Sequence, residues 1–356
     1  MNNKRDTTID VARGVGIVLM VWGHVNGPFK TPYIYLFHMA LFFIISGYIY
    51  EYHNDSSIKK YIIKRAKRLY IPHVVSGLIL VILTNLFVDW HLLDSSYRLP
   101  TILVFAKKIT TVLLFGGGDS LLGANWFLRS MFFGTIIYEI EHRIIKKRVI
   151  LIMILNLCLI FGGWFFTMKI GFGKWMNILS VPVLLDIGKI FRQHKLLNQI
   201  KLRYYLFFPI SLFVIFLLGF FGEISLNNNR IVNPIFFLLC AISGFIMTIS
   251  YSVIIQKFNI LKKIHIYLGQ NTMSILLLHY LSLKIVTLMQ IIIFKMEIDN
   301  LTAYPTLITD NFWWIIYLFV GISIPICLQI PAKYITKKIG LLITNFLTQT
   351  KIKREK

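Results

Sequence analysis

The sequence predicts an all-α polytopic integral membrane protein, with about ten transmembrane helices and both termini in the cytoplasm. Of its 356 residues, 56% are hydrophobic, and the mean hydropathy is +0.69. Soluble domains contain about 45–50% apolar residues. Several apolar runs approach or exceed the roughly 18–20 residues that cross a bilayer. The first run lacks a small-residue cleavage site and a second run follows at once, so we expect a membrane span there rather than a signal peptide.

Ten apolar segments, separated by polar or basic stretches, are the expected spans. Their approximate boundaries are 10–26, 33–51, 70–89, 124–140, 149–167, 175–191, 203–221, 234–255, 271–294 and 312–332. Residues 1–332 form one transmembrane domain in this prediction. Residues 333–356 form a basic, amphipathic cytoplasmic tail that we expect on the inner leaflet.

The distribution of positive charge gives the expected orientation. With a cytoplasmic N-terminus, 25 of the 38 lysines and arginines fall in inner segments and 8 fall in outer segments. Cytoplasmic loops carry such an excess in membrane proteins. The formal net charge of +23 is then explained by basic residues beside anionic lipid, and no nucleic-acid partner is expected.

Two apolar segments fit this scheme less well. Residues 99–119 carry Lys107 and Lys108 at their centre, so we expect an interfacial or re-entrant helix on the outer face. The segment 175–191 is short and contains Pro182 and Asp186, but we assign it as a span. The three cysteines are far apart and each lies within a span, which predicts neither a disulfide framework nor a metal site.

Two ionisable residues mark the first expected helix. Arg13 and His24 are eleven positions apart, which places them about 20° beyond three full turns and about 16 Å apart along the axis. They share a stripe with Ile17 and Met20, and Asp10 is spaced to pair with Arg13. Ionisable groups inside spans usually face the bundle interior and mark a pathway or site. Snorkelling of the arginine and an interfacial histidine are the alternatives.

The next two segments add candidates. His38 lies about five residues into the second span, at a depth similar to that of His24, so both could face one site. The segment 59–72 is strongly basic, and Arg65 and Arg68 lie on one side of a helix there. Such a pair suits phosphate groups. A positive-inside anchor explains these charges equally well.

Together these segments resemble the membrane acyltransferase 3 family, whose members are integral membrane O-acyltransferases of surface polysaccharides and other extracytoplasmic acceptors. The first-helix and FHMALFFIISGY forms are most similar to its fucose 4-O-acetylase-like branch. The resemblance covers almost the whole chain. It rests on Arg13 with His24, FHMALFFIISGY (37–48), RAKRLYIP (65–72), NWFLRSMFFG (125–134) and GQNTMSILLLHY (269–280).

The resemblance implies a donor and an acceptor on opposite sides of the membrane. Acetyl-CoA, the acyl donor, would place its phosphates near Arg65 and Arg68, and Arg13 would bind a phosphate or hold Asp10. The acceptor would be a polysaccharide or lipid-linked glycan at the outer face. His24, aided by His38, would be a general base or a covalent acyl carrier. No metal is implied.

Four further residues receive weaker roles from the same resemblance. Asn125, Trp126 and Ser274 could stabilise the thioester oxyanion, although such side chains more often join helices. His279 would line the donor path or be structural. A bacterial plasma-membrane enzyme is the expectation, and the oligomeric state stays open. A glycan transporter or flippase is the rival class, but the chain lacks the internal repeat typical of one; a sensor or scaffold has no direct support.

Overall fold

The computed structural model describes residues 6–25, 27, 31–51, 57–116, 120–146, 148–171 and 173–329. These residues form helices joined by turns and loops, and their one β feature is an isolated bridge between Ser225 and Arg230. The all-α prediction is therefore confirmed for this part of the chain. The predicted tail, 333–356, lies outside the described residues.

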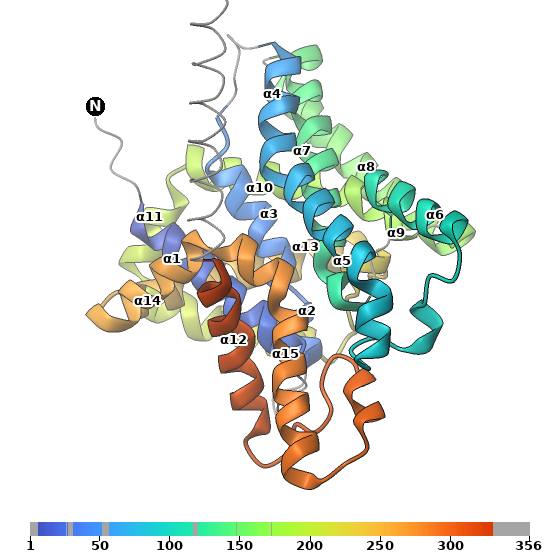
Figure 1. The fold of residues 1–356 in the computed structure, drawn as a ribbon. Coiled ribbons are helices and arrows are strands. Elements are labelled where there is room, and N and C mark those ends of the chain that lie inside the picture. The colour runs from blue at the N-terminus through green and yellow to red at the C-terminus, as the bar shows by residue number, and fades with distance from the viewer. Residues whose placement is uncertain are drawn as a thin grey trace, which may run out of the picture.

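Every predicted span contains at least one observed helix (Figure 1). An unlabelled apolar helix, Trp313–Gln329, follows the labelled ones. The labelled α-helices are α1 Thr7–Gly23, α2 Thr31–Tyr35, α3 His38–Tyr48, α4 Ile58–Arg65, α5 Ile71–Asp89, α6 Ile102–Leu113, α7 Trp126–Ile145, α8 Val149–Ile170, α9 Gly173–Met176, α10 Val181–Gln193, α11 Leu196–Leu202, α12 Tyr204–Leu218, α13 Pro234–Ile255, α14 Asn259–Gln270 and α15 Thr272–Phe294.

Four of the described helices are long and apolar enough to cross a membrane. They are the continuous helix Ile58–Asp89, α8, α13 and α15. A fifth crossing is possible if α11 and α12, which meet at an angle of 101°, form one broken span. The chain is thus an all-helical protein with membrane-capable helices, while the count of ten spans and the side of each terminus stay predictions.

Two predicted boundaries change. The basic segment before the third span is helical, as expected for Arg65 and Arg68, but it is continuous with that span, because α4 continues through a π-helical turn, Ala66–Tyr70, into α5. Pro72 lacks an N–H group, and the wider π turn before it accommodates the interrupted hydrogen-bond ladder. The second span is divided into α2 and α3, and Phe37 at this break packs directly against Gly244 of α13.

The segment 175–191 also differs from a simple span. It consists of α9, a short 3₁₀ helix and the 13-residue α10. Gly47 and Gly188 let α3 and α10 touch, because a Cβ atom on Gly188 would lie 2.0 Å from the Ile44 carbonyl oxygen. Asp186 on α10 is buried and accepts hydrogen bonds from Tyr138 and Asn156. The close contact agrees with the packing role that small residues have between membrane helices.

The described part of the segment 99–119 contains α6, which returns along α5. Asn85 donates to the Leu99 carbonyl at 3.0 Å, and Tyr70 donates to the Leu113 carbonyl at 2.9 Å. Ile102 is 81% exposed, as expected for a side chain that meets lipid. This antiparallel course fits the re-entrant alternative.

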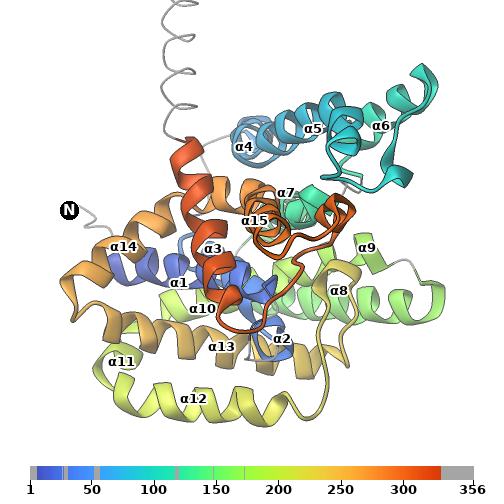
Figure 2. The same cartoon turned by 60° about the horizontal axis from the view of Figure 1, so that its bottom comes forward.

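Helix α1 lies in the interior of the bundle. Figure 2 shows α12 and α13 along one side, α1 and α10 in the middle, and α4 to α6 along the other side. Gly14 permits contact with α14, because a Cβ atom there would lie 2.1 Å from the His265 carbonyl oxygen. Helices α3, α13, α14 and α15 surround α1 in this arrangement. Ile17 and Met20, which are each 1% exposed, therefore lie in the core.

Candidate active site

His24 closes α1 and meets two tyrosines. The Tyr280 hydroxyl lies 3.0 Å from His24 Nδ1 and 3.2 Å from Nε2. The Tyr35 hydroxyl lies 3.2 Å from Nδ1 and also donates to the Gly23 carbonyl at 3.0 Å. Three different elements, α1, α2 and α15, therefore fix the position of this imidazole.

His279 lies against His24. Their ring centroids are 5.3 Å apart and the rings are stacked. His279 Nδ1 lies 3.0 Å from the carbonyl oxygens of Ile275 and Leu276. A carbonyl only accepts, so Nδ1 carries the proton and Nε2 keeps its lone pair. This Nε2 is buried and has no hydrogen-bond partner among the described residues. Sequence reasoning did not anticipate this position beside His24.

His38 joins the same group through Tyr35. The Tyr35 ring centroid lies 6.0 Å from that of His24 and 5.1 Å from that of His38. His38 Nδ1 donates to the Ile34 carbonyl at 2.8 Å, and the residue is 2% exposed. We call His24, His38, His279, Tyr35 and Tyr280 the histidine cluster. The two histidines from the first two predicted spans do lie in one group.

A loop beyond α15 completes this region. The Tyr304 ring lies 5.0 Å from that of Tyr280. Lys284, which is 3% exposed, donates to the carbonyls of Leu301 and Ala303 at 2.6 and 2.7 Å. This buried lysine therefore holds the loop that carries Tyr304.

A basic pocket of about 490 Å³ opens on one side of the cluster. Arg13, Arg65 and Arg68 all line it, together with Lys64. We call it the inner pocket, because the sequence assigns residues 52–69 to the cytoplasmic side. Arg65 is held by Tyr61, whose hydroxyl accepts from Nε at 3.0 Å. The structure thus brings together Arg13, Arg65 and Arg68, three candidate residues that lie on two separate segments of the sequence.

The apolar end of the inner pocket approaches the histidines. Ile17, Met39 and Leu276 line it there. Met39 is the neighbour of His38, and Leu276 lies one helical turn before His279 and Tyr280. The pocket therefore reaches from four basic side chains to the edge of the histidine cluster.

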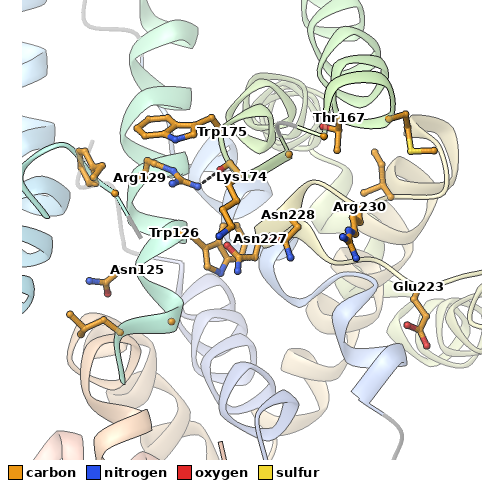
Figure 3. Close-up of a pocket in the computed structure, with 18 of the residues that line it drawn as sticks. Asn125, Trp126, Arg129, Thr167, Lys174, Trp175, Glu223, Asn227, Asn228 and Arg230 are labelled. Carbon is orange, nitrogen blue, oxygen red and sulfur yellow. Dashed lines mark hydrogen bonds between the residues drawn. The ribbon is translucent and has the colours of Figure 1, made fainter. Parts of the chain in front are cut away.

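A second pocket, of about 910 Å³, is shown in Figure 3. Its lining comes from the start of α7, the end of α8, α9 and the loop before α13. We call it the outer pocket, because the sequence assigns 168–174 and 222–233 to the outer face. Asn125 and Trp126 line the outer pocket, whereas Phe127 and Leu128 line the inner one. The first turn of α7 therefore separates the two pockets.

Two predicted oxyanion donors have other surroundings. Asn125 Nδ2 lies 3.3 Å from His73 Nδ1, and Asn125 Oδ1 is buried without a partner in the described structure. Its unused atom is thus a hydrogen-bond acceptor rather than a donor. Ser274 is half-buried and lines neither pocket. The pairing of Asp10 with Arg13 stays a prediction; Asp10 is 4% exposed.

A polar network supports the inner pocket from behind. Glu139, fully buried on α7, accepts hydrogen bonds from Tyr50, which lines the pocket, and from Arg143 at 2.7 Å. On the same helix Tyr138 donates to Asp186 at 2.9 Å. These bonds fix the pocket wall to α10. Within the described residues no group of three His, Cys, Asp or Glu side chains is placed to hold a metal ion.

Comparison with known proteins identifies the class. The acyltransferase domain model matches residues 6–330, and the chain therefore belongs to the acyltransferase 3 family. It is 27% identical over 150 residues to nodulation protein NolL of Mesorhizobium japonicum, a match that covers 39% of this chain and 36% of that protein. No solved structure matches the chain.

Proposed function

We propose that this acyltransferase moves an acetyl group from cytoplasmic acetyl-CoA to a sugar hydroxyl of an extracytoplasmic polysaccharide or lipid-linked glycan, as in the fucose 4-O-acetylase-like branch. The observation that carries the proposal is the position of Tyr280, which contacts His24 and lies next to residues of both pockets. Leu276 of the inner pocket lies one turn from Tyr280, and a Cβ atom on Gly123 of the outer pocket would lie 3.2 Å from the Tyr280 ring. Tyr280 is therefore close to both the proposed donor pocket and the proposed acceptor pocket.

The inner pocket suits an acyl-CoA. Its mouth carries Arg13, Lys64, Arg65 and Arg68 against one carboxylate, Glu51. Arginine binds phosphate oxygens through paired N–H groups, which matches the three phosphates of CoA. The apolar inner end suits the pantetheine arm, so the thioester would approach the histidine cluster.

His24 is the proposed general base. In the transfer, His24 takes the proton of the sugar hydroxyl while the sugar oxygen bonds to the thioester carbonyl carbon. The carbon–sulfur bond then breaks, and the CoA thiolate takes the proton back from His24. Tyr280 and Tyr35 orient the imidazole through their hydroxyls. A covalent acetyl-imidazole intermediate is the alternative, and it would divide the same transfer into two steps.

Turnover by the purified protein tests the proposal. Protein in detergent receives acetyl-CoA carrying carbon-14 together with a glycan extract from cells that lack the gene. We expect label to enter alkali-labile esters on the glycan with wild-type protein and not with His24→Ala. Hydrolysis or transfer that is equal in both proteins would contradict the role of His24. Movement of unmodified glycan across vesicles without label transfer would favour a flippase.

A further inference from the structure

Arg129 lies buried in the outer pocket and has no carboxylate partner among the described residues. Arg129, on the first turn of α7, is 4% exposed and lines the pocket. Its guanidinium donates to the Lys174 carbonyl and lies 4.5 Å from the centroid of the Trp175 ring. Its Nε has no hydrogen-bond partner, and no carboxylate pairs with it among the described residues. A buried charge without a counter-ion is costly, so this position suits a ligand that supplies one.

Other charges in the pocket have the same sign. Lys174 and Arg230 line it with Arg129, and both are exposed, so they can meet a ligand in solution. Among the described residues of the lining, Glu223 is the one acidic side chain. Figure 3 shows Arg129 and Lys174 together near Trp126, with Arg230 and Glu223 on the far side. The described part of the pocket lining therefore presents three positive groups and one negative group.

The remaining lining suits a saccharide. Trp126 and Trp175 line the pocket, and an indole face can pack against the apolar C–H face of a sugar ring; Arg129 covers one face of Trp175, which leaves the other face for a ligand. Asn227 and Asn228 add amides that donate and accept hydrogen bonds. Asn125 adds a buried, unpartnered Oδ1 that can accept from a hydroxyl. An unused acceptor and an unused cationic donor in one pocket match a ligand that carries both hydroxyls and an oxyanion.

We infer that the outer pocket binds an anionic saccharide, whose carboxylate or phosphate group lies at Arg129 and Lys174, while Arg230 contacts the saccharide from the far side of the pocket. The inference rests on the proposed function, because it takes this saccharide to be the acyl acceptor. The acylated hydroxyl would lie at the Gly123 side of the pocket, where Tyr280 borders it, so the anionic group belongs to the same sugar residue or a near neighbour. Neutral glycans lack the group that neutralises Arg129.

Labelling of the natural acceptor tests the inference. Membrane vesicles from cells that make wild-type or His24→Ala protein receive acetyl-CoA carrying carbon-14, and the extracted glycans pass over an anion-exchange column. We expect the His24-dependent label to bind and to elute with salt; uronic-acid and phosphorus assays of that fraction then show which oxyanion is present. Label in the unbound, neutral fraction would contradict the anionic saccharide but would leave the proposed acyltransferase function in place. Absence of any His24-dependent label would overturn the proposed function as well.

Charge variants test the pocket itself. Arg230→Gln and Lys174→Gln should each raise the KM for the labelled acceptor fraction by about tenfold, the size of one lost hydrogen bond to a charged group. The Kd for acetyl-CoA should not change. Lys295→Gln, an exposed cation outside the pocket, is the matched control and should leave both constants unchanged. An unchanged acceptor KM in both pocket variants, or weaker acetyl-CoA binding in either, would overturn the assignment.

Discussion

His24 is the residue on which the mechanism depends. His24→Ala should lower the rate at saturating acetyl-CoA by 10²–10⁴-fold if the imidazole is a general base, and it should leave almost no turnover if the imidazole carries the acetyl group. Binding of acetyl-CoA should stay unchanged, because His24 does not line the inner pocket. His38→Ala should also lose most activity if the histidines act as one site. The measurement is the initial rate of folded protein, and a near-normal rate for His24→Ala would make the residue a packing side chain.

Replacement of Arg65 and Arg68 distinguishes a role in donor binding from a role in membrane anchoring. Replacing both with alanine should weaken acetyl-CoA binding, since each lost charge-assisted hydrogen bond costs roughly 1.5–3 kcal/mol. Lys59→Ala with Lys60→Ala is the matched control, because these exposed residues lie on the same helix but do not line the pocket. Direct binding to purified protein measures the effect. Equal affinity in both double variants would leave the arginines as anchors.

Residue by residue, the sequence revealed the polar members of the site better than the aromatic ones. His24 and Arg13 could be selected because an ionisable side chain in an apolar run needs an explanation. Tyr280 and Tyr35 could not, because tyrosine is common at membrane interfaces for reasons unrelated to catalysis. The sequence shows Arg129 as a charged residue within a predicted span. Its contacts with α9, and its lack of a carboxylate partner among the described residues, depend on how α7 packs against α9.

At the scale of elements, Lys284 links helix α15 to the loop that carries Tyr304. Lys284→Met removes the donor to two carbonyls, and each buried acceptor left unsatisfied costs about 1–3 kcal/mol. We expect faster hydrogen exchange in residues 298–305 and a lower turnover number, while acetyl-CoA affinity stays unchanged. Lys295→Met, one turn beyond the last buried residues of α15, is an exposed control. Unchanged exchange in the loop would show that other contacts hold it.

Hydropathy predicted where the helices lie, but it did not predict where one helix is interrupted or where two helices are continuous. Every predicted span holds a helix, because the backbone N–H and C=O groups of a long apolar segment in a bilayer must be hydrogen-bonded within the segment. The break between α2 and α3 was missed, since Phe37 contacts Gly244, which is distant in the sequence. The continuation of α4 into α5 was missed as well, because the residue before a proline is disfavoured in a helix, so Pro72 indicates a helix boundary. Both features position residues of the site.

At the scale of the whole molecule, the orientation of the chain in the membrane decides which compartment each pocket faces. Besides residues of the predicted spans, the inner pocket is lined by part of the segment 52–69, which the sequence assigns to the cytoplasm, and the outer pocket by parts of 90–123, 168–174 and 222–233, which it assigns to the other side. Acetyl-CoA is made in the cytoplasm and does not cross a bilayer, so the basic pocket has to face inwards for the proposed reaction. An inverted protein would present the donor site to the wrong compartment.

Cysteine labelling of intact cells tests this orientation. In a background with Cys158, Cys240 and Cys327 replaced by alanine, Asn228→Cys should react with a membrane-impermeant maleimide, and Lys60→Cys should react after the membrane is opened. Asn228 borders the outer pocket, and Lys60 is exposed on α4 beside the inner one. The expectation follows from the 25-to-8 excess of basic residues on the inner segments. Reaction of Lys60→Cys in intact cells, with none at Asn228→Cys, would reverse the orientation. It would also remove cytoplasmic acetyl-CoA as the donor for the basic pocket.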